Sequence, residues 1–127
     1  MAQGHRKERA DSYIQRQLTL MLRDKVRDPR IDPLTITEVS LTRDRRIARV
    51  YVASYGDEDT LKEGLAGLES AKGLLRHELA QLLHWPWVPE LLFRVDRSWQ
   101  YGEHMDRLID QVRQEREDED EDTDQSG

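Results

Sequence analysis

The feature of this sequence that most constrains its fold is a stripe of leucines between residues 61 and 82. The leucines are separated alternately by four and three residues, which is the spacing of one face of an amphipathic α-helix. Lys72 occupies the one position of the stripe that lacks a leucine, and Gly73 follows it. Because glycine disfavours a helix by about 1 kcal/mol relative to alanine, we predict a break or kink from Ala71 to Gly73. The stripe consists of Leu61, Leu65, Leu68, Leu75, Leu79 and Leu82.

The N-terminal part of the chain predicts another helix, over residues 7–26. Ile14, Leu18 and Met21 recur at helical spacing and form one apolar stripe. Pro29 disfavours the helical conformation at the residue before it, so the helix should end near Arg27.

Two strands and a charged turn are predicted next. Residues 34–41 and 47–54 are rich in β-branched side chains, and the turn at residues 43–46 is charged, so the two segments should form a hairpin. The apolar side chains of the first strand change parity midway. We expect a β-bulge near Thr37 and Glu38; a strand that uses both faces is the alternative.

The leucine-rich helix should begin after Gly56, with Asp57 or Asp59 as its N-cap. Alternating apolar residues from Leu91 to Val95 predict a third strand, and residues 100–113 predict a last helix. The expected order is α-β-β-α-(kink)-α-β-α. The fold class is therefore α+β, with a three-stranded sheet covered by helices on one face.

Charge is distributed unevenly along the 127 residues. The net charge is −6, but residues 114–127 hold eight acids and one base, whereas residues 1–49 hold 12 bases and seven acids. We expect one domain over residues 1–113 and a disordered acidic tail over residues 114–127. The basic N-terminal half suggests a polyanionic partner.

Signatures of enzymes are missing from the sequence. It has no glycine-rich phosphate loop, no nucleophile elbow and no dinucleotide fingerprint. His77 and His84 have no third ligand spaced with them, so we expect neither a metal nor another cofactor. The chain has no cysteine and no apolar run of the roughly 20 residues that span a bilayer, so we expect a cytoplasmic protein without membrane attachment.

Basic side chains provide the candidate RNA-binding residues, in three groups. Each group could be an ordinary solvated surface, but together they favour phosphate binding. Trp85 and Trp87 could stack on bases, although we expect them to close the core around Pro86. The groups are Arg23, Lys25, Arg27 and Arg30 after the first helix, Arg43, Arg45 and Arg46 in the hairpin turn, and Lys72 and Arg76 at the kink.

The predicted order of elements, with small residues between the two middle helices, resembles a type II KH domain. Ordinary KH domains carry a GXXG loop there that clamps the nucleic-acid backbone, whereas this chain has an A-x-G form, with Ala71 and Gly73 as the hinge. Together with other short strings, this pattern resembles the bacterial ribosome-binding factor A family. The strings are Asp28-Pro29-Arg30, Leu34–Val39, Ala48–Val52, Ala71–Arg76, Pro89–Phe93, Asp96-Arg97-Ser98 and Gly102.

The resemblance implies a small monomeric factor that acts by binding and not by catalysis. Such factors bind the free small (30S) ribosomal subunit and assist late 16S rRNA maturation, including 5′-end processing, most importantly in cold growth. A GTPase assists their release. The segment from Trp85 to Trp87 and the acidic tail do not match the family pattern.

Three alternatives remain open at this point. A DNA-binding helix-turn-helix would use residues 74–83 as its recognition helix, but Arg76 and His77 are its only useful polar readers. An rRNA-processing nuclease and a module that binds only proteins are the others.

Overall fold

The computed structural model describes the backbone of residues 2–98 and the side chains of residues 8–98. Within this part of the chain, two helices and three strands follow one another in the order α1–β1–β2–α2–β3. The predicted last helix at residues 100–113 and the predicted acidic tail lie outside the described residues. The elements are α1 (Ala2–Asp24), β1 (Leu34–Leu41), β2 (Ile47–Ser54), α2 (Glu58–Leu82) and β3 (Glu90–Val95).

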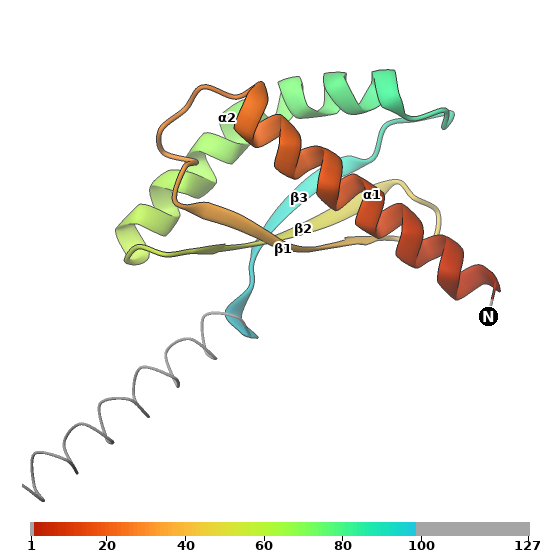
Figure 1. The fold of residues 1–127 in the computed structure, drawn as a ribbon, viewed down its shortest axis with the longest axis horizontal. Helices are drawn as coiled ribbons and strands as arrows, with labels where there is room; N and C mark the ends of the chain where they lie inside the picture. The colour runs from red at the N-terminus through yellow and green to blue at the C-terminus, as the bar shows by residue number, and fades with distance from the viewer. Residues whose placement is uncertain (1, 99–127) are drawn as a thin grey trace, which may run out of the picture. The chain divides into compact units, whose positions relative to one another are not determined.

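The three strands form one mixed sheet in the order β1-β2-β3. β1 and β2 pair antiparallel, and β2 and β3 pair parallel. The register shifts between Ile36 and Glu38, so the predicted bulge is confirmed. Figure 1 shows both helices over the same face of the sheet. The α+β class and the sheet covered on one face are therefore confirmed.

α1 ends at Asp24, somewhat earlier than the predicted end near Arg27. The backbone N–H groups of Lys25 and Val26 both donate to the carbonyl of Met21, at 2.8 and 3.1 Å. Because both N–H groups share one carbonyl, the last turn closes there and the regular helical hydrogen bonding stops. The helix therefore ends before the residues whose conformation Pro29 restricts.

α2 is one continuous helix of 25 residues, so the predicted break at residues 71–73 does not occur. The axis nevertheless changes direction in the green middle part of the helix, which is the kink that we predicted as the other possibility (Figure 1). Continuity also removes the basis of the helix-turn-helix alternative, because residues 74–82 belong to the same helix as residues 58–73.

Two of the glycines in α2 allow close packing. A Cβ on Gly64 would lie 2.7 Å from Cγ of Leu34, and a Cβ on Gly67 would lie 2.9 Å from a side-chain carbon of Ile31. Both glycines are buried. The segment before β1 and the first residue of β1 therefore approach the helix backbone at these two positions.

Asp57 is the N-cap of α2, one of the two residues predicted for that role. Its carboxylate accepts hydrogen bonds from the backbone N–H and from the hydroxyl of Thr60, both at 2.8 Å. The backbone N–H bond is the largest cause that lowers the pKa of Asp57.

Because the pKa of Asp57 is lowered in the folded protein, its contribution to stability should be full at neutral pH and should disappear as the pH falls through the folded-state value. We expect Asp57→Ala to lower the urea midpoint at pH 7 and to have less effect at pH 3. Asp57→Asn is the control. It retains a hydrogen-bond acceptor at the N-cap, so its urea midpoint at pH 7 should fall less than that of Asp57→Ala. An equal loss for Asp57→Ala at both pH values would contradict this account.

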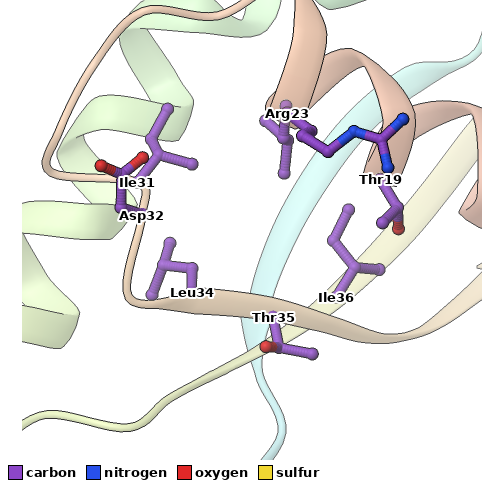
Figure 2. Close-up of a pocket in the computed structure, with 8 residues that line it drawn as sticks. Thr19, Arg23, Ile31, Asp32, Leu34, Thr35 and Ile36 are labelled. Carbon is purple, nitrogen blue, oxygen red and sulfur yellow. The ribbon is translucent and has the colours of Figure 1, made fainter.

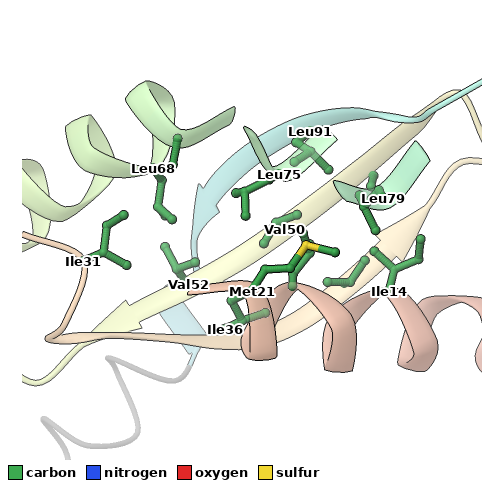
Figure 3. Packing of buried hydrophobic residues seen from close by; sticks show 14 of the residues in the cluster. Ile14, Met21, Ile31, Ile36, Val50, Val52, Leu68, Leu75, Leu79 and Leu91 are labelled. Atoms are coloured by element: carbon green, nitrogen blue, oxygen red, sulfur yellow. The ribbon is translucent and has the colours of Figure 1, made fainter. Parts of the chain in front are cut away.

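The core lies between the covered face of the sheet and the two helices (Figure 3). Ile14 and Leu18 from α1 and Leu68, Leu75 and Leu79 from α2 are almost completely buried there. Leu82, which we placed on the buried leucine stripe, is instead 39% exposed. α2 ends at this residue, so its last leucine extends beyond the core.

Candidate nucleic-acid interface

The turn between β1 and β2 is held by hydrogen bonds that converge on Asp44. Its carboxylate accepts from the hydroxyl of Thr42 at 2.8 Å and from the backbone N–H of Arg46 at 3.1 Å. The Thr42 hydroxyl is the largest cause that lowers the pKa of Asp44. Arg45 has a φ of 60°, in the left-handed region. The acidic side chain of this turn is therefore used to fix the turn's backbone.

Two arginines of this turn stack on two tryptophans of the α2–β3 connection. The Arg45 guanidinium lies 4.7 Å from the centre of the Trp85 ring, and the Arg46 guanidinium lies 4.1 Å from that of Trp87. Trp87 Nε1 donates to the carbonyl of Arg45 at 3.1 Å. The backbone N–H of Glu90 donates to the carbonyl of Arg46 at 2.8 Å. Residues 85–90 thus contact the turn both through the stacked tryptophan rings and through hydrogen bonds to its backbone carbonyls.

Lys72 lies over the sheet although it occupies a leucine position. Its ammonium is 5.6 Å from the centre of the Phe93 ring and 2.8 Å from a carboxylate oxygen of Glu69. The long aliphatic stem of a lysine can cover apolar surface while its charged end stays in water, and the Lys72 side chain is 27% exposed. Lys72 therefore fits the stripe without breaking the helix.

Gly73 presents bare backbone next to Lys72. A Cβ at this position would have no neighbouring atom within 4 Å, so Gly73 differs from Gly64 and Gly67. Nothing inside the described part of the fold requires a glycine here. Open space beside exposed helix backbone is what a closely approaching ligand backbone would need.

Arg76 ties α2 to the segment before β3. Its guanidinium donates to the carbonyls of Val88 and Pro89, each at 3.1 Å. Arg76 thereby positions the same segment that carries Trp87. Its predicted role in RNA binding stays a prediction, beside this structural one.

The other predicted basic group lies at the opposite end of β1. Arg23, Lys25, Arg27 and Arg30 precede β1, whereas Arg43, Arg45 and Arg46 follow it, and an eight-residue strand spans about 26 Å. The two groups do not form one cluster.

Two of these residues are also ion-paired. Arg30 pairs with Asp28 at 2.6 Å and Arg23 with Asp24 at 2.9 Å. The hydrogen bonds to the two arginines lower the pKa of both carboxyl groups. The group before β1 therefore offers less uncompensated charge than the sequence suggested.

An open pocket of about 290 Å³ lies between α1, the turn that follows it, and β1 (Figure 2). Thr19 and Arg23 extend into it from the helix, and Leu34 and Ile36 face them from the strand. Among the described residues, no group of three or more potential ligands could hold a metal ion. No helix in that same range is long and apolar enough to cross a membrane.

Sequence reasoning missed three contributors to the basic surface around α2 and the β1–β2 turn. Phe93 underlies Lys72, and Thr42 and Asp44 hold the arginine-bearing turn. Aspartate and threonine side chains often bond nearby backbone in turns, so their presence at residues 42 and 44 could have indicated the second feature. We expected Trp85 and Trp87 to close the core; Trp85 does contact the core cluster, but both rings also stack on arginines.

Comparison with known proteins decides the family. Residues 6–109 match the family described as ribosome-binding factor A. The chain belongs to the ribosome-binding factor A family. The ribosome-binding factor A of Lactobacillus delbrueckii subsp. bulgaricus is 43% identical over 115 residues, which cover 90% of this chain and 96% of the relative.

Solved structures of the ribosome-binding factor A family share this fold. The solution structure of a putative ribosome-binding factor A from Thermotoga maritima is 37% identical, covers 70% of this chain and 85% of its own, and has a TM-score of 0.65. A homology model of the Thermus thermophilus factor was fitted into a cryo-EM map of a 30S–RbfA complex. It is 28% identical, covers 68% of this chain and 91% of its own, and has a TM-score of 0.55.

Proposed function

We propose that this protein is a ribosome assembly factor that binds the free 30S subunit and assists late 16S rRNA maturation, including 5′-end processing. Membership of the ribosome-binding factor A family over residues 6–109 carries this proposal. A structural relative fitted into a 30S complex supports the choice of subunit. The protein acts by binding and not by catalysis, as a cytoplasmic monomer with its binding domain in residues 1–113.

The main rRNA contact combines Lys72 and Gly73 of α2 with Arg45 and Arg46 of the β1–β2 turn. Lys72, whose ammonium is paired with the exposed Glu69, directly precedes the bare backbone of Gly73, and Arg45 and Arg46 present guanidinium groups at the turn. Contacts of this kind are made to the phosphates of the RNA backbone and do not recognise the base sequence directly. The remaining basic residues contribute around this centre and at the other end of β1. They are Arg23, Lys25, Arg27, Arg30, Arg43 and Arg76.

A binding protein can change rRNA only by holding one of its conformations better than another. Misfolded RNA is trapped more deeply in the cold, so the factor should matter most at low temperature. Release from the matured subunit then requires an rRNA rearrangement or an assembly GTPase.

Sedimentation with isolated ribosomal subunits tests this function directly. Purified protein should co-migrate with the small subunit and not with the large one, and the co-migration should weaken as salt is raised, because bound phosphates release counterions. Equal binding to both subunits, or none to mature and precursor small subunits alike, would overturn the proposal.

A cellular experiment tests the maturation step separately. Deletion of the gene should slow growth in the cold and leave 16S rRNA with an unprocessed 5′ end, as read by primer extension. Re-expression of the wild-type chain should restore both properties. Normal 5′ ends in the deletion strain would contradict the role in processing even if binding to the subunit were found.

Gly73→Ala should change stability and binding in opposite directions. Alanine fits the open space at residue 73 and favours a helix, so the free energy of unfolding should rise by up to about 1 kcal/mol. Binding to the 30S subunit should weaken, because the new methyl group lies on the proposed RNA-facing backbone. Urea denaturation and co-sedimentation measure the two effects.

Gly64→Ala is the matched control, because its Cβ would meet Leu34. We expect it to gain less stability than Gly73→Ala, or to lose stability, and to leave binding unchanged. Unchanged 30S binding by Gly73→Ala would remove Gly73 from the interface.

A further inference from the structure

Trp85 and Trp87 lie outside the short sequence strings that resemble the family. In the structure, the partner of each tryptophan ring is an arginine. Each ring is half-buried and lies under one guanidinium of the β1–β2 turn, at 4.7 Å for Arg45 and 4.1 Å for Arg46. Pro86 separates the two rings and restricts the backbone between them. Two neighbouring arginines are thus stacked on two tryptophans from one short segment.

Stacking restrains an arginine without using its hydrogen-bond donors. A guanidinium over a ring is held through its face, whereas its N–H groups point outward in its own plane and can form a fork to a phosphate. Among the described residues, no carboxylate lies within ion-pair distance of Arg45 or Arg46. Asp44, the nearest acid in sequence, accepts from Thr42 and from the backbone N–H of Arg46.

The indole of Trp87 also fixes the backbone between the two arginines. Its Nε1–H donates to the carbonyl of Arg45, the residue whose φ of 60° lies in the left-handed region. That conformation is uncommon for a residue with a side chain, so an added contact helps to hold it. The same segment therefore sets both the backbone of the turn and the direction of its two charged side chains.

We propose that Trp85 and Trp87 are positioning residues that hold Arg45 and Arg46 as a rigid pair of phosphate-binding forks for the RNA backbone. This inference rests on the proposed function and assigns a role that the family membership does not. A free arginine side chain loses much rotamer freedom when it binds. In this protein most of that freedom is already removed before RNA arrives, which strengthens binding.

Variants that retain the positive charges can distinguish the positioning of the two arginines from simple electrostatic attraction to RNA. Arg45→Lys with Arg46→Lys retains both positive charges but loses the planar stacked forks. We expect 30S affinity to fall about tenfold, because each stack at an exposed site contributes about two- to fivefold. The slope of log affinity against log salt should stay unchanged, since the number of charges is the same. The control is Arg9→Lys with Arg16→Lys, in two exposed arginines of α1 that lie outside the proposed interface, which should bind as the wild type does.

Changes at the tryptophans test the same stacks from the other side. Trp85→Leu with Trp87→Leu should weaken 30S binding by a similar factor, again without changing the salt slope. Trp85→Phe with Trp87→Phe restores a ring face under each guanidinium and should recover most of the affinity. In the Arg45→Lys, Arg46→Lys background the leucine changes should have little further effect, because the two sets act through one contact.

NMR of the free protein supplies a readout that does not depend on RNA. The Nε–Hε groups of Arg45 and Arg46 should be as ordered as the backbone in the wild type and should become mobile in the leucine variant. High mobility in the wild type would overturn the inference. So would wild-type affinity in both the lysine and the leucine variants. If the wild type does not bind 30S subunits at all, the proposed function fails and this inference fails with it.

Discussion

Replacing Arg45 and Arg46 with glutamate should weaken binding to the 30S subunit about 100-fold or more while the domain stays folded. Hydrogen bonds between charged groups contribute about 1.5–3 kcal/mol each, so the loss of two of them accounts for at least this factor. If each arginine neutralises one phosphate, the log–log salt slope should become shallower by about 1.4. Sedimentation across a salt series measures both quantities.

Arg9→Glu with Arg16→Glu is the matched control for this reversal. Both residues are exposed on α1, and the pair changes the net charge of the protein by the same amount. We expect this control to lose a little affinity through long-range electrostatic repulsion. Its loss should be much smaller than that of the Arg45→Glu, Arg46→Glu variant. Equal losses in both double variants would mean that overall charge drives binding. Wild-type affinity of the turn variant at low salt would exclude the proposed contact.

Leu79→Ala should strongly destabilise the fold. Leu79 is completely buried, and truncation of a buried leucine costs about 2–5 kcal/mol because a cavity remains. The urea midpoint should fall while the slope of the transition stays constant, since the folded state itself remains compact.

The control is Leu82→Ala, three residues further along the same helix. Leu82 is 39% exposed, so we expect a loss of less than about 1 kcal/mol. Similar losses at the two positions would contradict the placement of the end of the core. They would favour the continuous leucine stripe that spacing alone predicts.

Local patterns predicted the strands well. Both strands of the hairpin, residues 34–41 and 47–54, have the predicted bounds, and the parity change at the bulge was visible in the sequence. These features depend on neighbouring residues only. The roles of the glycines in α2 were harder to predict. A glycine that breaks a helix and a glycine that lets a neighbouring segment pack closely look the same in the local sequence. Only the packing of Leu34 against Gly64 distinguishes them.

The basic surface was predicted by composition but not by arrangement. The sequence shows that Arg30 and Arg45 belong to basic groups, but not that a strand of about 26 Å separates the groups. It also does not show that Asp28 pairs with Arg30 whereas Asp44 is used within its own turn. The stacks on Trp85 and Trp87 join segments about 40 residues apart in the sequence, and no local pattern reports such contacts.

The parallel pairing of β2 with β3 has a consequence for the order of folding. The β1–β2 hairpin closes over a short turn and can form within microseconds, whereas β3 can pair only after the whole of α2 has been placed across the sheet. The segment that carries Trp85 and Trp87 arrives with β3. We therefore expect the arginine turn to be formed early but to become rigid only in the last step, so that a partly folded chain has little affinity for RNA.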